Sequence, residues 1–378
     1  MPLTALDHTR LAEALVLAHE AIGVSDPNPR VGCIVGHADA RVLGRGATQR
    51  AGGPHAEIVA LRAARAAGHE PRGATAWVTL EPCAHHGRTP PCCDALVDAG
   101  IARVVVGIGD PYAGTNGSGI ARLRAAGIEV EMADAAFAAA ARELNIGFFS
   151  RVLRARPWVR LKIAASLDGR TALADGRSQW ITGAASRADG HAWRRRASAV
   201  LTGIGTVRTD DPRLDVREVP ALLQPTLVVV DSRLETPPAA RLFDVPDRPV
   251  WIYGVMPDEA HDKARAAALA ARGATLRTLG AAHGRVDLGA LLGELAGRGI
   301  NELHVEAGAR LNAALLDADL VDELLVYLAP KLIGPGRELA ALAPLAALDA
   351  ARALRFVDVQ RIGDDLRLVL RPPGRELF

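Results

Sequence analysis

Hydrophobic positions in the first part of the chain alternate between helical and strand spacing. Residues 7–22 carry apolar side chains at three- and four-residue intervals, which predicts a helix. Further helices are predicted to begin at His55, after a glycine pair and a proline, and at Pro91. Short apolar runs predict four strands, at residues 31–35, 42–46, 74–80 and 103–108. This order of elements is typical of an α/β domain.

A second alternation of strands and helices begins at Trp158. The basic, proline-terminated stretch 151–157 is predicted to be a linker, which gives domains at residues 1–150 and 155–378. Alanine-rich stretches at 133–142 and 264–272 predict ordinary helices. Strands of the second domain are predicted at residues 158–164, 199–201, 226–231, 250–253, 302–306, 323–328 and 366–370.

Composition narrows the class of protein. The chain has 378 residues, 49% of them hydrophobic, and no apolar run near 18 residues, so we expect two buried cores and no membrane partner. The start lacks the pattern of an export signal, and the four cysteines fit a cytoplasmic protein. Acidic and basic residues are interspersed at a net charge of +2, which argues against a nucleic-acid partner. We also expect a homo-oligomer.

Three residues have the types and order of a catalytic zinc site. His55, Cys83 and Cys92 supply one imidazole and two thiolates, which leaves the fourth position of a tetrahedral zinc for water. Glu57 follows the histidine by two residues and is predicted to be the general acid and base. A catalytic zinc lowers the pKa of its bound water to about 7, so this set predicts hydrolysis of an exocyclic amine.

A closed structural zinc site is the alternative, with His85, His86 or Cys93 as a fourth ligand. A closed site has no use for Glu57, which favours the catalytic interpretation. We predict Cys92 rather than Cys93 as the ligand because it directly follows two prolines. Cys33 lies in an apolar run and is interpreted as a small core residue.

Cofactor motifs in the second half are less specific. Residues 305–310 join a strand to a helix predicted to begin near Leu311, where backbone N–H groups can hold a phosphate. The segment is not the GxGxxG fingerprint. A plain turn is the favoured interpretation both of this segment and of the glycine turn at 203–207. The residues alone therefore predict a zinc hydrolase joined to an α/β domain.

Longer motifs extend this picture over nearly the whole chain. The first domain carries NPRVG at 28–32, HAE at 55–57, TLEPC at 79–83 and HGRTPPC at 86–92. The second carries LK at 161–162, SLDG at 166–169, SQWIT at 178–182, GIGTVRTDDP at 203–212 and VEAG at 305–308. The chain thereby resembles the bifunctional riboflavin-biosynthesis deaminase/reductase family. The resemblance implies a cytidine-deaminase-like three-layer domain followed by a dihydrofolate-reductase-like α/β domain.

The resemblance implies two consecutive reactions. The 2-amino group of 2,5-diamino-6-(ribosylamino)pyrimidin-4-one 5'-phosphate is hydrolysed at zinc, and NADPH then reduces the ribosyl unit to ribityl. Implied NADPH-site residues are Ala164, Trp180, Thr206, Asp210, Ser232, Gly308, Ala309, Arg310, Leu311, Asn312, Ala313 and Ala314. Implied substrate-binding residues are Asn28, Asp110, Lys162, Ser178, Arg194, Leu214, Arg217 and Glu306. Arg194 and Arg217 have the chemistry to bind a phosphate group. Lys162 is expected to orient or protonate the opening sugar, and the alternative is a solvated surface lysine.

Two positions depart from the family's pattern. Tyr112 stands where the family usually has asparagine, and Thr48 stands where many relatives have histidine. The resemblance places both near the ribose phosphate of the deaminase substrate. One alternative is therefore a paralogue in another pyrimidine-derived, toxoflavin-like pathway. Nucleic-acid base deamination is another, although 4% aromatic residues and no basic stripe argue against it. A non-catalytic zinc scaffold is the third.

Overall fold

The computed structural model describes residues 3–87, 89–255, 260–282 and 284–378. Its internal contacts divide the chain into two units, Met1–Arg154 and Ala155–Phe378. The stretch 151–157 is predicted to be a linker, but its first four residues form the end of helix α6 (Ile146–Arg154). This helix buries Phe148 and Phe149, and its Arg151 and Arg154 are half-buried, so the basic residues there belong to a helix and not to a linker.

Unit 1 contains a five-stranded mixed sheet in the order β2-β1-β3-β4-β5. Strands β2, β1 and β3 are antiparallel neighbours, whereas β3, β4 and β5 run parallel. The elements are α1 Ala5–Ala18, η1 His19–Ala21, β1 Gly32–Gly36, β2 Val42–Ala47, α2 Ala56–Ala66, β3 Thr75–Val78, α3 Cys92–Asp98, β4 Arg103–Val106, α4 Ser118–Ala125, β5 Glu129–Met132, α5 Ala135–Leu144 and α6.

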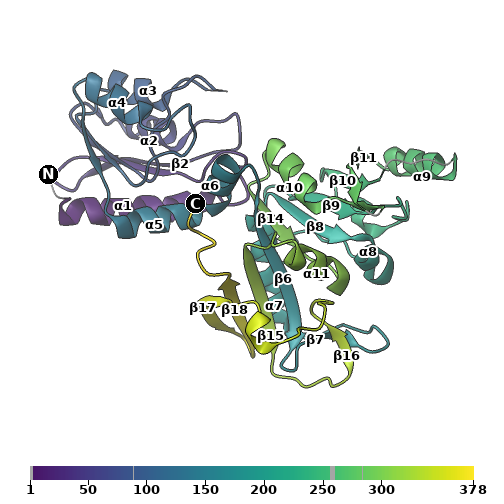
Figure 1. Cartoon of the computed structure of the whole chain (residues 1–378). Coiled ribbons are helices and arrows are strands. Elements are labelled where there is room, and N and C mark those ends of the chain that lie inside the picture. Colours follow the sequence, from purple (N-terminus) through teal and green to yellow (C-terminus); the bar gives the residue numbers. More distant parts are fainter. Residues whose placement is uncertain (1–2, 88, 256–259, 283) are drawn as a thin grey trace. The chain divides into compact units, whose positions relative to one another are not determined.

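Helices cover both faces of this sheet, as Figure 1 shows for α1 and α5 on one side and α2, α3 and α4 on the other. Glycines allow the close approach. A Cβ on Gly32 would lie 1.9 Å from the carbonyl oxygen of Ala14 in α1. A Cβ on Gly44 would lie 2.1 Å from the carbonyl oxygen of Ala60 in α2. The sheet therefore seats α2 directly on its backbone, which fixes the position of the helix N-terminus.

Unit 2 contains a nine-stranded sheet in the order β11-β10-β9-β8-β14-β6-β15-β18-β17. Neighbours are parallel from β11 to β15, and β18 and β17 add an antiparallel edge. The elements are β6 Trp158–Ser166, β7 Arg170–Leu173, α7 Ala184–Arg196, β8 Ala199–Gly203, α8 Ile204–Asp210, β9 Thr226–Val230, η2 Arg241–Phe243, β10 Val250–Gly254, α9 Ala260–Ala271, β11 Ala274–Thr278, β12 Ala281–Ala282, β13 Arg285–Val286, α10 Leu288–Gly297, β14 Glu302–Val305, α11 Ala309–Asp317, β15 Glu323–Ala329, β16 Gly336–Glu338, η3 Leu348–Ala350, β17 Arg355–Ile362 and β18 Asp365–Arg371.

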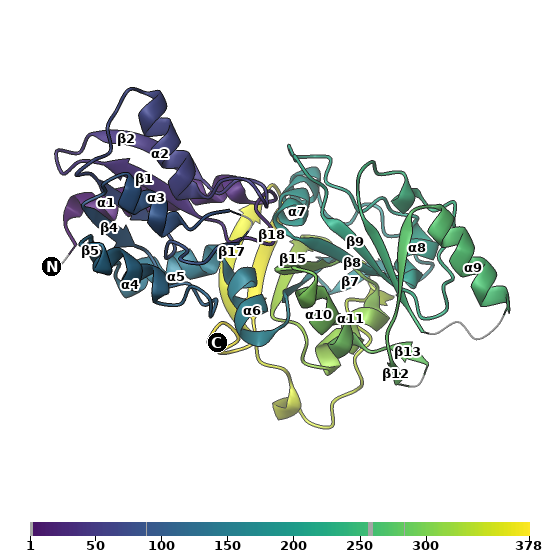
Figure 2. The same cartoon turned by 90° about the horizontal axis from the view of Figure 1, so that it is seen from above.

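The central strands of unit 2 bury both faces. Leu201 of β8 belongs to one apolar cluster with α10 and α11, and the adjacent Val200 belongs to another with α8 and α9. Figure 2 shows α10 and α11 together beside the sheet. Because successive strand residues point to opposite faces, a strand buried on both faces needs a continuous apolar run, as residues 227–230 of β9 provide.

A buried charge network ties four strands of unit 2 together. Arg160 on β6 is 1% exposed and lies between Glu302 on β14 and Glu323 on β15. Its Nη1 is 2.8 Å from Glu302 Oε2, and Glu323 is also bonded by Arg371 of β18. The guanidinium and carboxylates neutralise one another, which satisfies groups that would be costly to bury alone.

Replacing Arg160 by Ala should destabilise the chain by about 3–5 kcal/mol, because two carboxylates lose their shared buried cation. Denaturant unfolding measures this free energy. Arg361→Ala is the matched control, since the Arg361 side chain is 75% exposed and should change stability by less than about 0.5 kcal/mol. Equal midpoints for the two variants would contradict the role given to the network.

Candidate active sites

The residues predicted to bind zinc come from one strand end and two helix ends of unit 1. His55 is the N-cap of α2, and Cys92 is the first residue of α3. Cys83 follows β3 at its carboxyl end. Helix N-termini carry a partial positive charge, which stabilises thiolates placed beside them. The backbone N–H of Cys92 indeed donates to Cys83 Sγ at 3.3 Å.

The three side chains converge with a spacing that fits zinc. His55 Nδ1 lies 3.6 Å from Cys83 Sγ and 3.3 Å from Cys92 Sγ. All three donor atoms lie within 4.8 Å of one another. In a tetrahedral site with ordinary zinc–ligand lengths, a nitrogen and a sulfur ligand are about 3.6 Å apart. Nδ1 is therefore the imidazole atom that faces the metal position.

The charges of the two thiols also fit a cation. The side-chain hydrogen bond between the two thiols lowers the pKa of the Cys83 thiol to about 4. The same interaction with Cys83, together with burial, raises the pKa of the Cys92 thiol far above its usual range. The protein alone thus stabilises one thiolate, and a dication supplies the charge that holds the second.

Glu57 lies in the first turn of α2, two residues after His55, and is 3% exposed. Burial, followed by the nearby charge of Cys83, raises the pKa of the Glu57 carboxyl to about 7. A carboxyl of this pKa exchanges a proton readily near neutral pH.

The other cysteines and histidines of unit 1 near these motifs lie outside this group of three. Cys93 Sγ donates to the carbonyl oxygens of Pro82 and Gly119, at 3.2 and 3.5 Å. His85 Nδ1 lies 3.0 Å from the hydroxyl of Thr115. His86 is exposed, and Cys33 is buried in β1. Among the described residues, only His55, Cys83 and Cys92 form a group with metal-ligand geometry. Arg88 of the same motif lies outside the described residues.

Asp110 follows β4, the strand beside β3, so the carboxyl ends of parallel strands bring it to the same edge as Cys83. It is 8% exposed, and burial raises its pKa to about 6. Tyr112 is 47% exposed, with its ring centroid 5.3 Å from that of His85. Thr48 is buried and its hydroxyl donates to the carbonyl oxygen of Val31. Asn28 is half-buried in the turn after Ser25.

A second polar cluster lies around Glu306 of unit 2, directly after β14. Arg194 of α7 binds its carboxylate with two nitrogens, the Nη2 contact being 2.9 Å. Lys162 Nζ on β6 lies 3.6 Å from Glu306 Oε2, and His304 Nε2 lies 3.4 Å from Oε1. Burial by itself raises the pKa of Glu306, but Arg194 and Lys162 outweigh it and hold the pKa well below the usual range.

Asp215 joins the other predicted substrate residues to this cluster. Its carbonyl oxygen accepts from Arg194 Nη1 at 3.0 Å, and its carboxylate accepts from Arg217 Nη1 at 2.5 Å. Leu214, just before it, is buried with a left-handed backbone φ of 51°. The sequence analysis did not identify Asp215. Its only signal in the sequence is its place between the predicted residues Leu214 and Arg217.

The predicted NADPH residues follow several strand ends. Gly308 is the N-cap of α11, and a Cβ on it would lie 3.9 Å from the Thr206 hydroxyl oxygen. The α11 segment Ala309 to Ala314 therefore begins next to α8, which carries Thr206 and Asp210. Asn312 donates to the carbonyl oxygen of Leu339 at 2.7 Å, and Leu311 packs near Gly203.

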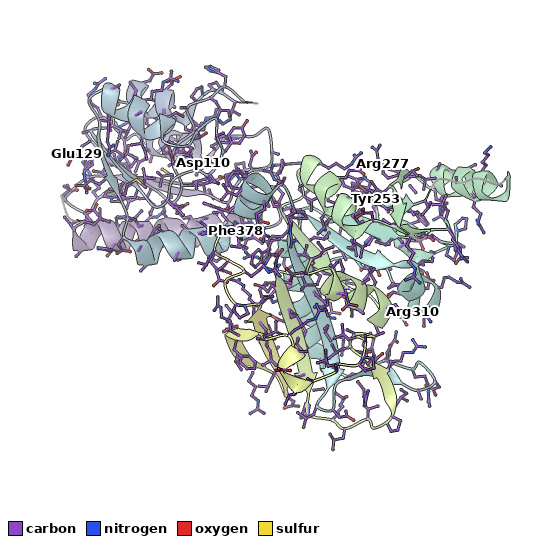
Figure 3. The ribbon with its side chains drawn as sticks, in the orientation of Figure 1. Asp110, Glu129, Tyr253, Arg277, Arg310 and Phe378 are labelled. Carbon is purple, nitrogen blue, oxygen red and sulfur yellow. The ribbon has the colours of Figure 1, made fainter. Side chains whose placement is uncertain are left out.

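The remaining predicted residues are more scattered. Ser232 follows β9, and its hydroxyl accepts from the N–H of Val286. Ala164 is on β6, paired with Tyr327. Trp180 is 61% exposed beneath the Arg187 guanidinium, while Ser178 is half-buried in the same loop. Arg310, labelled in Figure 3, extends from the first turn of α11.

Each of the two units matches a known protein family. Residues 5–108 match the cytidine and deoxycytidylate deaminase zinc-binding region, and residues 157–368 match the RibD C-terminal domain. Riboflavin biosynthesis protein RibD of Escherichia coli is 42% identical over 379 residues, covering 96% of this chain and 99% of that protein. RibD of Aquifex aeolicus is 38% identical, covering 96% and 97%.

Solved structures agree with these matches. Form 1 of Acinetobacter baumannii RibD has a TM-score of 0.87 and 39% identity, covering 97% of this chain and 99% of that chain. A Thermotoga maritima structure described as a diaminohydroxyphosphoribosylaminopyrimidine deaminase/5-amino-6-(5-phosphoribosylamino)uracil reductase has a TM-score of 0.84 and 31% identity, covering 97% and 99%.

The fold and the sites define an enzyme in which a zinc-dependent deaminase domain precedes an NADPH-dependent reductase domain, a hydrolase joined to an oxidoreductase. The chain belongs to the RibD family of riboflavin biosynthesis proteins. The predicted family and the predicted pair of α/β domains are thereby confirmed, and the paralogue and nucleic-acid alternatives are not favoured.

Cys83→Ser should lose most of the zinc bound per chain, because a hydroxyl replaces one of two soft thiolate ligands. Elemental analysis of the purified protein measures the metal. Cys93→Ser is the matched control, since Cys93 hydrogen-bonds to backbone carbonyls and should retain zinc. Zinc loss from Cys93→Ser with retention in Cys92→Ser would reverse the choice of ligand.

Proposed function

We propose that unit 1 hydrolyses the 2-amino group of 2,5-diamino-6-(ribosylamino)pyrimidin-4-one 5'-phosphate, and that unit 2 reduces the ribosyl unit of the product to ribityl. The observation that best supports this proposal is that His55, Cys83 and Cys92 converge around one position beside the buried carboxyl of Glu57. The domain division proposed for these activities is residues 1–150 and 155–378.

In the deaminase site, zinc when bound lets a water molecule act as nucleophile near neutral pH. His55 Nδ1 and the two thiolates hold the metal, and Glu57 remains available for proton transfer. Its carboxylate takes a proton from the attacking water and then delivers it to the departing nitrogen, which leaves as ammonia. The burial of Glu57 suits both halves of this cycle, because it raises the pKa of the carboxyl to about 7, where both protonation states are populated.

Substrate contacts in unit 1 are assigned to Asp110 and Asn28. Asp110 lies at the strand edge that also carries Cys83, so its carboxyl is within reach of polar groups on a bound pyrimidine nucleotide. Tyr112 and Thr48 are the two positions that depart from the family's pattern. Tyr112 is exposed, so its hydroxyl is available to contact a ribose phosphate.

In the reductase site, NADPH when bound supplies the hydride. The N-terminus of α11, capped by Gly308, offers backbone N–H donors to the cofactor, and Thr206 and Asp210 of α8 offer a hydroxyl and a carboxyl group. Glu306 is held as a carboxylate by Arg194, and Lys162 on the same carboxylate carries a proton that can stabilise the opening sugar oxygen. Arg217, with 48% of its side chain exposed, is placed to bind the substrate phosphate.

The enzyme acts on a phosphorylated pyrimidine, and we further propose that it works as a cytoplasmic homo-oligomer without a nucleic-acid or membrane partner. Among the described residues, no helix is long and apolar enough to cross a membrane.

Glu57→Gln should retain zinc and lose deaminase activity by at least ~100-fold, because the amide cannot carry the proton. Product detection by mass spectrometry measures deamination, and the reductase activity of the same preparation serves as the control. Substantial deamination by Glu57→Gln would remove the proposed role of this carboxyl.

A fragment of residues 155–378 should fold and bind NADPH by itself, since unit 2 has its own sheet and apolar clusters. Isothermal calorimetry of the soluble fragment measures binding, with the full chain as reference. A folded fragment that does not bind NADPH would show that the cofactor site has been misassigned.

A further inference from the structure

The carboxylate of Glu81 receives hydrogen bonds from four backbone N–H groups of one segment. Oε2 accepts from Asp110 at 3.2 Å and from Gly117 at 3.1 Å. Oε1 accepts from Gly119 at 3.0 Å and from Ile120 at 3.2 Å. Glu81 lies between β3 and the ligand Cys83, and only 3% of it is exposed. Hydrogen bonds to a buried charged acceptor are among the stronger ones in proteins.

Two of these bonds cap helix α4 from outside the helix. Its N-cap residue is Gly117, which has φ of 75° and no side chain to accept from the first turn. Glu81 accepts from the second and third residues of the helix instead, which are the donors an N-cap side chain normally satisfies. Its negative charge also complements the positive end of the helix dipole.

The anchored segment 110–122 lies directly on the loop that carries Cys83. A Cβ on Gly119 would lie 2.1 Å from the carbonyl oxygen of Pro82. The Thr115 hydroxyl contacts His85, and Arg122 donates to the carbonyl oxygen of Ala84 at 3.1 Å. A displacement of the segment would therefore move the predicted substrate residue Asp110 and would also disturb the loop that carries Cys83.

We propose that Glu81 is a positioning residue of the deaminase, which locks residues 110–120 beside the metal ligands so that Asp110 is presented to the pyrimidine substrate. This inference rests on the deaminase function proposed above. Glu81 itself takes no part in proton transfer or metal binding, because its four acceptor sites are occupied by the four backbone donors. Its charge serves to hold one loop against another.

Glu81→Gln in the full chain tests the proposal. The isosteric amide retains one acceptor oxygen, so two of the four backbone N–H groups lose their partner. We expect kcat/KM for deamination of the diaminopyrimidinone ribosyl phosphate to fall roughly 10- to 100-fold, mainly through KM. Zinc content and NADPH-dependent reduction should equal those of the wild type. Glu129→Gln, an exposed carboxylate on β5 labelled in Figure 3, should leave all three measurements unchanged.

Further outcomes separate the possible explanations. Hydrogen exchange should quicken in residues 110–120 of Glu81→Gln and stay unchanged in α2, a pattern that general unfolding does not produce. Glu81→Asp keeps the charge but shortens the reach, so it should show a smaller rise in KM. Unchanged deamination kinetics in either folded variant, or zinc loss from Glu81→Gln, would overturn the proposal. A wild-type chain that does not deaminate the substrate would instead reject the proposed function.

Discussion

The packing of α2 onto the glycines of β2 is the contact on which the deaminase site depends. Gly44 and Gly46 leave no room for side chains between sheet and helix, since a Cβ on either would collide with the α2 backbone. The helix is thereby fixed at backbone distance, and its N-terminus presents His55 and Glu57 to the strand end that carries Cys83. The metal position results from a helix and a sheet that cannot shift relative to one another without steric conflict.

The two candidate sites contain buried glutamates whose pKa values are shifted in opposite directions. In unit 1, Glu57 is buried beside Cys83, and burial first and the charge of Cys83 second bring its pKa to about 7. In unit 2, Arg194 and Lys162 hold the pKa of Glu306 well below the usual range, which keeps a permanent carboxylate. The same type of side chain thus has a pKa suited to proton exchange in one domain and to a fixed negative charge in the other, because its neighbours differ.

Parallel strands explain why residues far apart in the sequence meet in each domain. Cys83 and Asp110 follow the neighbouring strands β3 and β4, and Glu306 follows β14 beside the strand that carries Lys162. Carboxyl ends of parallel strands collect at one edge, where loops vary without disturbing the sheet. The loops at this edge can therefore vary while the metal-ligand residues keep their geometry.

The sequence by itself determined the family, the order of most strands and helices, and the group His55, Cys83, Cys92 and Glu57, because motif spacing and apolar periodicity are local properties. It did not reveal strand β17, whose residues are mostly exposed and lack a buried alternation, or the helical continuation to Arg154. Only the tertiary structure decided the role of Glu81 and Asp215. Their partners are backbone groups and side chains brought together by chain crossings, and a sequence pattern carries no direct record of such contacts.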